Sequence, residues 1–249
     1  MKRVFWDLEV SPNIVFTWRL GSKVFLGHDS VIKERAIICA CWKEEGVGKV
    51  NSLEWDKGDD KDLCIKLREA IIDADELVAH NGDNFDFKWF NTRLIFHGIE
   101  PLPEIKTVDT LKLARRKFYF NSNKLDYISN YLGYPKKDKT DFSMWQNILM
   151  DNSESDMKRM VTYCKKDVVL GEKVYHRLAI HNKPSTHMGV LDGGERHDCP
   201  RCGSEYAKLS KRNVTAAGMP RFQMRCDSCR GYFTLTKTSY DKFKEAHIV

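Results

Sequence analysis

Phe5-Trp-Asp-Leu-Glu-Val10 is a strand-like stretch near the amino terminus that carries two acidic residues in an otherwise apolar run. Side chains two positions apart on a strand point to the same face, so the carboxylates of Asp7 and Glu9 are expected to emerge together. Two negative charges at the edge of a buried sheet are unfavourable unless a cation neutralises them. An exposed strand end is the structural alternative, and Asp-x-Glu alone does not decide between the two.

Strand and helix patterns follow one another along the chain from this stretch. Residues 3–10, 36–43 and 50–55 have the β-branched and aromatic character of strands. Helical periods and short apolar strands then alternate, with helices over 60–74, 84–97, from 110, over 125–132, 142–150 and 153–180, and strands over 76–80 and 105–108. Three strands followed by strand–helix units predict an α/β domain with a mixed sheet flanked by helices.

A further acidic position follows the predicted strand at 76–80, in Ala79-His-Asn-Gly-Asp-Asn-Phe-Asp86. Sites in open α/β sheets collect at the carboxyl ends of strands, which makes Asn81 and Asp86 candidate site residues. The structural alternative is that Asp83 or Asn84 caps the following helix, which would not exclude Asp86 as a metal ligand.

The third acidic pattern, Tyr163-Cys-Lys-Lys-Asp167, lies inside the longest predicted helix. A spacing of four places the phenol of Tyr163 and the carboxylate of Asp167 on one helical face, one turn apart. A tyrosine at the edge of the core beside a surface aspartate is the structural alternative for this segment on its own.

In this order, the three patterns resemble the exonuclease motifs of the DEDD superfamily of 3′→5′ exonucleases, in its tyrosine-bearing branch. That family has the ribonuclease H-like fold, and the proofreading domains of family B DNA polymerases are relatives. The resemblance covers about residues 1–181, and Thr107-Val-Asp-Thr-Leu111 is similar to the family's Asp-Thr-Leu segment. The chain departs from the family at Val10, where many relatives have Thr, and at residues 13–34, which are aromatic-rich and of open role.

The resemblance implies a metal-dependent 3′→5′ exonuclease that hydrolyses phosphodiester bonds at single-stranded DNA ends with two Mg²⁺ or Mn²⁺ ions. Carboxylates suit these hard cations. By the same resemblance Asp7 would bridge both ions, Glu9 and Asp167 would complete the ion on the nucleophile side, and Asp86 would hold the second ion. Tyr163 would orient the attacking water, because a phenol is a poor base at neutral pH.

Two other functions stay open at the level of sequence. Relatives of the family act on RNA as well, so an RNA-trimming 3′→5′ exonuclease is one alternative. The other is a non-catalytic nucleic-acid-binding zinc-ribbon protein, against which the five intact motif positions argue, since clustered carboxylates repel phosphate. The expected partners are single-stranded DNA, or RNA, and a replication or repair protein.

Eight cysteines divide into two groups. Four lie in apolar or helical patterns and are typical of small buried residues in a reducing compartment: Cys39, Cys41, Cys64 and Cys164. The other four form C-x2-C-x23-C-x2-C, and their thiolates can complete one structural Zn²⁺ site: Cys199, Cys202, Cys226 and Cys229. Two disulfides are the competing interpretation.

The second cysteine group lies in a basic carboxyl-terminal segment. Residues 183–249 contain 12 Lys and Arg against 7 Asp and Glu, which is most of the net charge of +6 and suits a polyanionic partner as well as a solvated surface. Strand patterns at 206–211, 221–225 and 232–236 predict a small zinc-ribbon domain. We therefore expect an exonuclease domain over 1–182, a linker over 183–195 with Pro184 and three glycines, and a zinc ribbon over 196–249.

Candidate contacts to nucleic acid are basic or polar residues near these features. On the ribbon, cations interleave with aromatic residues, a pattern that holds single strands, although Phe222 and Phe233 fit the ribbon's own core equally well. The predicted contacts are Asn81, Arg115, Arg116, Lys208, Arg212 and Arg221.

Composition excludes several other classes of protein. With 42% hydrophobic residues, including 28 aromatic ones, the chain is not intrinsically disordered. No apolar run approaches the ~20 residues of a membrane span, and acidic residues interrupt the amino-terminal stretch where a secretory signal would be apolar. We expect a cytoplasmic protein of a microbe, or of a virus in its host cell.

Overall fold

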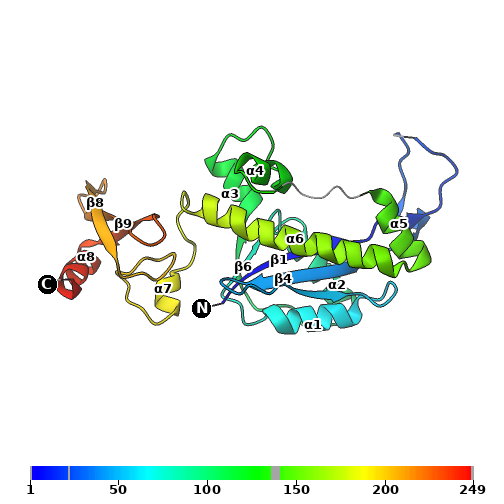
Figure 1. The fold of residues 1–249 in the computed structure, drawn as a ribbon, viewed down its shortest axis with the longest axis horizontal. Coiled ribbons are helices and arrows are strands. Elements are labelled where there is room, and N and C mark those ends of the chain that lie inside the picture. Colours follow the sequence, from blue (N-terminus) through cyan, green and yellow to red (C-terminus); the bar gives the residue numbers. More distant parts are fainter. Residues whose placement is uncertain (1, 22, 136–140, 248–249) are drawn as a thin grey trace.

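The computed structural model describes residues 2–21, 23–135 and 141–247 of the chain (Figure 1). A five-stranded sheet forms its larger part, in the order β5-β4-β1-β6-β7. The strands are β1 (Arg3–Val10), β4 (Ile37–Glu44), β5 (Asn51–Glu54), β6 (Glu76–Ala79) and β7 (Lys106–Asp109). β1 pairs antiparallel with β4 and parallel with β6, so the predicted mixed sheet is confirmed.

The central strand β1 is buried on both faces of the sheet. Phe5 packs on one face, whereas Val4, Trp6 and Leu8 pack on the other. A strand covered on both sides is apolar on both faces, which explains the uninterrupted apolar run of Val4, Phe5 and Trp6. Asp7 therefore interrupts a buried strand.

Helices cover both faces of the sheet, as the sequence predicts. The bounds are α1 (Lys61–Ile71), α2 (Asp86–Phe96), α3 (Thr110–Lys117), α4 (Leu125–Tyr131), α5 (Phe142–Asp151) and α6 (Glu154–Ala179). α1 and α2 pack on the face of Trp6, while α5 and α6 pack on the face of Phe5. α6 runs along the whole sheet in Figure 1, and its carboxyl-terminal half also packs against α3 and α4.

Backbone hydrogen bonds in the turn before α2 make this helix shorter than its sequence pattern predicts. The helical period begins at residue 84, but α2 begins at Asp86. The carbonyl of Asn81, whose φ is +68°, accepts hydrogen bonds from the amides of Asn84 at 3.1 Å and Phe85 at 3.0 Å. This turn uses the amides that an earlier helix start would have left without partners.

Residues 13–34 leave the sheet after β1 and return to it before β4. Two short strands, β2 (Ile14–Val15) and β3 (Val31–Lys33), pair antiparallel at the root of this excursion, and a 3-10 turn (His28–Ser30) precedes β3. Figure 1 shows the excursion projecting from the end of the sheet near α5. We call residues 13–34 the arm.

The carboxyl-terminal part is a three-stranded antiparallel sheet in the order β10-β9-β8. The strands are β8 (Ala207–Val214), β9 (Pro220–Cys226) and β10 (Tyr232–Thr236), close to the three predicted ranges. A helix that the sequence did not indicate, α8 (Lys237–Ala246), follows β10, and Tyr240 on it stacks on Phe222 with ring centroids 4.0 Å apart. Phe222 and Phe233 therefore belong to the core of this part of the protein.

The predicted linker at 183–195 contains a short helix, α7 (Met188–Leu191). Gly189 in α7 packs so closely that a Cβ there would lie 2.8 Å from the Cα of Gly203. The division of the chain at residues 182 and 195 stays a prediction. Within the part of the chain that the structure describes, no helix combines the length and apolarity of a membrane span.

Candidate functional site

Asp7 and Glu9 lie two positions apart on β1, on the same face of the sheet as Phe5, which α5 and α6 cover. Asp7 is opposite Cys41 and Glu9 is opposite Cys39 in the antiparallel register with β4. Both acidic side chains are half-buried, whereas Leu8 between them is buried in the core on the other face. The same-face prediction follows directly from this alternation.

α6 brings the third acidic pattern onto the same surface. Its amino terminus is capped by the Ser153 hydroxyl, which accepts from the amide of Asp156 at 3.3 Å. Further along the helix, the thiol of Cys164 donates to the backbone carbonyl of Asp7 at 3.4 Å. Half-buried Tyr163 and buried Asp167 flank this contact, one turn apart on α6.

The carboxylates of Asp7, Glu9 and Asp167 meet as a result. One oxygen from each lies within 4.8 Å of the others. Three negative groups this close repel one another strongly unless a cation lies between them. All three ligand atoms are carboxylate oxygens, which matches the preference of Mg²⁺ and Mn²⁺.

Asp86 approaches β1 from the first turn of α2. It lies outside the group of three oxygens but is tied to the same strand, because its Oδ1 accepts from the amide of Leu8 at 2.9 Å. Burial raises the pKa of Asp86 to about 7, although hydrogen bonds from the amides of Leu8 and of Asp86 itself oppose the rise, and the charge of Asp109 adds to it. A nearby cation is the usual way to keep such a buried carboxylate ionised.

Asp109 is a second buried carboxylate, and the sequence did not single it out as a site residue. Its Oδ1 accepts from the amides of Asn81 at 3.0 Å, Leu111 at 2.9 Å and Lys112 at 3.2 Å. Its Oδ2 is buried and has no hydrogen-bond partner among the residues that the structure describes. An aspartate before a helix is expected to be an ordinary cap. Only the structure therefore shows that the second oxygen is buried in this way.

A cavity of about 10 Å³ opens beside the acidic group, with Asp7, Asp167, His80 and Thr110 in its lining. Its size is that of a single water molecule. The ring of His80 is oriented by Thr110 Oγ1 at 2.8 Å and by the carbonyl of Asn123 at 2.9 Å. His80 and Thr110 are thus neighbours of the acidic residues that sequence spacing did not indicate.

The predicted nucleic-acid contacts are spread over several surfaces. Asn81 is beside Asp109, as described above, while Arg115 and Arg116 are exposed on α3, and Arg116 donates to Asn182 Oδ1 at 2.6 Å. On the ribbon, exposed Lys208 pairs with Asp227 at 3.5 Å, and exposed Arg212 and half-buried Arg221 lie on β8 and β9. The structure does not bring these residues into one cluster with the acidic group.

The four carboxyl-terminal cysteines converge as the spacing predicts. Their sulfur atoms all lie within 4.8 Å of one another, with Cys199 and Cys229 3.7 Å apart and Cys202 and Cys226 also 3.7 Å apart. Zn–S bonds of about 2.3 Å in a tetrahedron place sulfur atoms about 3.8 Å apart. These cysteines therefore fit a structural zinc ion and a zinc ribbon.

Comparisons with known proteins agree with this fold. The family model for the RNase_H superfamily matches residues 33–179, which include Asp86, Tyr163 and Asp167 and begin after Asp7 and Glu9. Over 70 residues, 28% of this chain, the sequence is 43% identical to the DNA polymerase III PolC-type of Ureaplasma parvum serovar 3, of which the match covers 5%.

Among solved structures, the family B DNA polymerase from the hyperthermophilic archaeon Pyrobaculum calidifontis superposes with a TM-score of 0.54 at 15% identity. The superposition covers 72% of this chain and 24% of that polymerase, and at this identity it shows the fold alone. The chain thus spans a small part of either polymerase.

Proposed function

The chain belongs to the RNase_H superfamily, and from this premise we propose that it is a metal-dependent 3′→5′ exonuclease acting on single-stranded DNA ends. The observation that carries the proposal is the meeting of Asp7, Glu9 and Asp167 oxygens within 4.8 Å. The motif resemblance supplies the 3′→5′ direction, and the two similar polymerases are named for DNA, which favours DNA over RNA.

The acidic residues fit a pair of divalent cations. Asp7, Glu9 and Asp167 would hold one ion between them, and Asp86, joined to β1 through the Leu8 amide, would hold the second together with Asp7. When bound, two such ions lower the pKa of the attacking water and stabilise the leaving 3′-oxygen.

The remaining residues of the site position the reactants. Tyr163 would hold the attacking water by its phenol, one turn of α6 from Asp167. Asn81 would contact the substrate at the carboxyl end of β6, where its left-handed backbone turns toward α2. Buried Asp109 fixes that turn through the Asn81 amide, 3.0 Å from its Oδ1.

Basic residues would guide the strand toward the site. We assign phosphate contacts to Arg115 and Arg116 on α3 and to Lys208, Arg212 and Arg221 on the ribbon. On this proposal, the ribbon raises affinity for substrate, with one structural Zn²⁺ holding it folded. A replication or repair protein in the cytoplasm is the expected partner.

The decisive experiment follows single-stranded DNA and RNA of one sequence, labelled at the 5′ end, with Mg²⁺, with Mn²⁺ or with EDTA. We expect a ladder of DNA shortened from the 3′ end, dependent on Mg²⁺ or Mn²⁺. Asp7→Ala should abolish it, Tyr163→Phe should slow it less, and Asp62→Ala, an exposed acidic residue on α1, should leave it unchanged. Near-normal cleavage by folded Asp7→Ala protein would defeat the proposal.

The same assay, with binding of the same strands measured beside it, separates the two alternatives. Faster shortening of RNA than of DNA would indicate an RNA-trimming enzyme with the same site. Binding of either strand without any cleavage by the wild-type chain would indicate a non-catalytic nucleic-acid-binding zinc-ribbon protein.

A further inference from the structure

The arm is closed at its base by hydrogen bonds between the residues that flank it on either side. The amide of Ser11 donates to the carbonyl of Ala36 at 2.9 Å, and the amide of Ala36 donates to the Ser11 hydroxyl at 2.9 Å. Beyond them β2 and β3 pair, and the amide of Phe16 donates to the carbonyl of Ser30 at 3.0 Å. The root of the arm is therefore a defined two-stranded structure.

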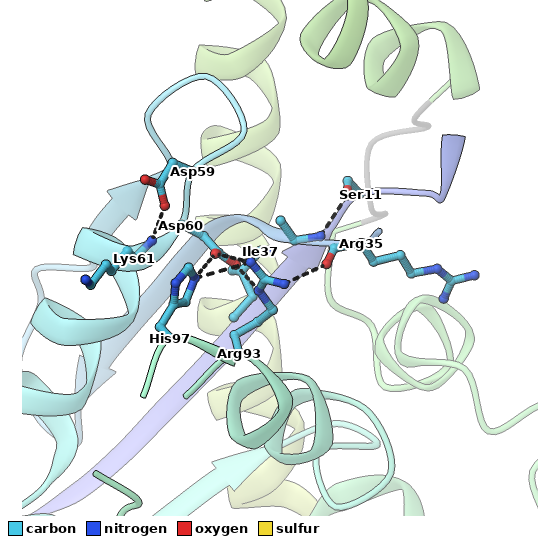
Figure 2. Close-up of polar contacts among 9 residues, drawn as sticks. Ser11, Arg35, Ile37, Asp59, Asp60, Lys61, Arg93 and His97 are labelled. Atoms are coloured by element: carbon cyan, nitrogen blue, oxygen red, sulfur yellow. Dashed lines mark hydrogen bonds and ion pairs between the residues drawn. The ribbon is translucent and has the colours of Figure 1, made fainter. Parts of the chain in front are cut away.

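A buried ionic network fixes the residues that follow the arm, Arg35 and Ile37, to the domain (Figure 2). Fully buried Asp60 accepts from the Ile37 amide at 2.8 Å, from Arg93 at 2.7 and 2.8 Å, and pairs with His97 at 2.6 Å. Arg93 also donates to the carbonyl of Arg35 at 3.3 Å. Both oxygens of Asp60 are engaged by these donors, so this cluster holds the arm in place and is not a metal site.

The tip of the arm, residues 16–27, begins where the pairing of the root ends, and its aromatic side chains are exposed. Phe16 is 79% exposed, Trp18 104% and Phe25 98%, and none of them belongs to the four apolar cores of the described chain. The three rings lie within ten residues of one another along the chain, and exposed aromatic side chains brought close together mark a binding surface more often than isolated ones do. Their exposure on a firmly anchored base indicates that the tip is built to contact something outside the domain.

Charge at the tip has one sign. Residues 16–27 include Arg19 and Lys23 and no acidic residue. Aromatic rings interleaved with cations suit a single-stranded nucleic acid, whose bases stack on the rings while its phosphates meet the cations. This charge favours a polyanionic strand over the tip of a second copy of the chain, which would carry the same positive charge.

The base of the arm lies beside the candidate site. Ser11 follows Glu9 by two positions on the chain, at the end of β1. On the other side of the base, the guanidinium of Arg35, the residue after the arm, lies 5.5 Å from the ring centroid of Trp89, which is three residues after Asp86 on α2. A strand leaving the acidic group can therefore reach the arm.

We propose that the arm tip, through Phe16, Trp18 and Phe25 with Arg19 and Lys23, binds the single-stranded substrate upstream of its 3′ end. This inference rests on the proposed function for the place of the 3′ end. The arm would hold the strand between successive cleavages by contacts that are independent of sequence.

The test measures binding of the full chain to dT and rU oligonucleotides of increasing length, by fluorescence anisotropy, without added Mg²⁺ or Mn²⁺. The Trp18→Ala/Phe25→Ala variant should bind long oligonucleotides at least about fivefold more weakly than wild type. The difference should shrink for oligonucleotides too short to span from the site to the arm. Ile95→Ala, which removes an exposed apolar side chain on α2, is the control. Wild-type affinity of the double variant for every length would overturn the inference.

A second variant separates stacking from general apolar contact. Trp18→Leu/Phe25→Leu keeps an apolar tip but removes the rings, so it should bind as weakly as the alanine variant if bases stack there. Wild-type affinity of the leucine variant would overturn the stacking role. Comparison of dT with rU shows whether the arm discriminates between DNA and RNA.

The outcome is distinguishable from failure of the proposed function. If the wild-type chain never shortens an oligonucleotide with Mg²⁺ or Mn²⁺, the exonuclease proposal fails while the arm is still tested by binding. If wild type shortens DNA and the arm variants also bind every length like wild type, only the arm inference is lost.

Discussion

Cys164 and Asp7 are joined across the fold, because the thiol of the helix residue donates to the backbone carbonyl of the strand residue at 3.4 Å. The contact lies between Tyr163 and Asp167 on one side and the acidic pair of β1 on the other. It fixes the distance between two elements that supply proposed metal ligands.

We expect Cys164→Ala to lower cleavage about tenfold, because loosening a contact next to the reacting groups misplaces them. The loss of stability should be about 1 kcal/mol, the usual effect of a single buried substitution. Cys164→Ser, which keeps a donor for the Asp7 carbonyl, should recover part of the activity.

The control for this variant is Cys64→Ala, because Cys64 is equally buried but packs on the opposite face of the sheet. It should lose similar stability in thermal unfolding and keep wild-type cleavage. Equal losses of activity from both variants would mean that the Cys164 contact has only a structural role.

Asp86→Asn tests the metal at the buried carboxylate. The amide can still accept from Leu8 but has no charge for a cation to neutralise, so added Mn²⁺ should raise the thermal midpoint of wild type more than that of the variant. Cleavage should be lost as well. Differential scanning calorimetry with and without Mn²⁺ measures the effect, and an equal rise in both proteins would remove Asp86 from the metal site.

Asp60→Asn should destabilise the protein by about 3 kcal/mol at neutral pH, since it breaks a buried ion pair and leaves Arg93 without its partner. Burial acts to raise the pKa of Asp60, but hydrogen bonds from Arg93, His97 and the Ile37 amide prevail and hold that pKa below its ordinary value.

The sign of the pH dependence follows from that lowered pKa. The contribution of ionised Asp60 is complete above the unfolded-state pKa of about 3.9 and is lost as pH falls through the lower folded-state value. The stability difference between wild type and Asp60→Asn should therefore narrow below about pH 4 in urea unfolding. Asp62→Asn, exposed on α1, should show no such difference.

Zinc should be present at one ion per chain and should hold the ribbon folded. Cys229→Ser should release it and expose the β8–β10 sheet to protease, because a small domain of this kind gains much of its folding free energy from the metal. Metal content by mass spectrometry checks this, and zinc content should not change under reducing conditions. Two disulfides and no zinc would support the competing interpretation of these cysteines.

The ribbon cations should contribute to salt-dependent binding. Replacing Lys208, Arg212 and Arg221 with alanine should reduce the slope of log affinity against log salt by up to about 2 for a single strand. A matched loss of three charges on α8, at Lys237, Lys242 and Lys244, is the control. Equal slopes for the two triple variants would leave the ribbon without a specific role in binding substrate.

The regular elements were predictable because burial imposes a period on their sequence. β1 matches its predicted range, and α6 differs from its pattern by one residue at each end. The grouping of Asp7, Glu9 and Asp167 also follows from strand alternation and helical spacing once the elements are packed. Their roles in catalysis stay predictions.

Contacts between distant segments were not predictable. Asp60 looks like an ordinary helix start, yet it binds Arg93 of α2, His97 directly after α2, and the amide of Ile37. Likewise α8 is a short amphipathic helix, and its Tyr240 packs on Phe222 of β9. No local period encodes such partners, so only the folded chain reveals them.

The contact between Cys164 and Asp7 joins residues 157 positions apart. During synthesis β1 leaves the ribosome long before α6, so the acidic group cannot assemble until α6 has been made. Truncated products would lack the helical half of the group altogether. The nuclease activity proposed for this chain would therefore be absent until translation has passed α6.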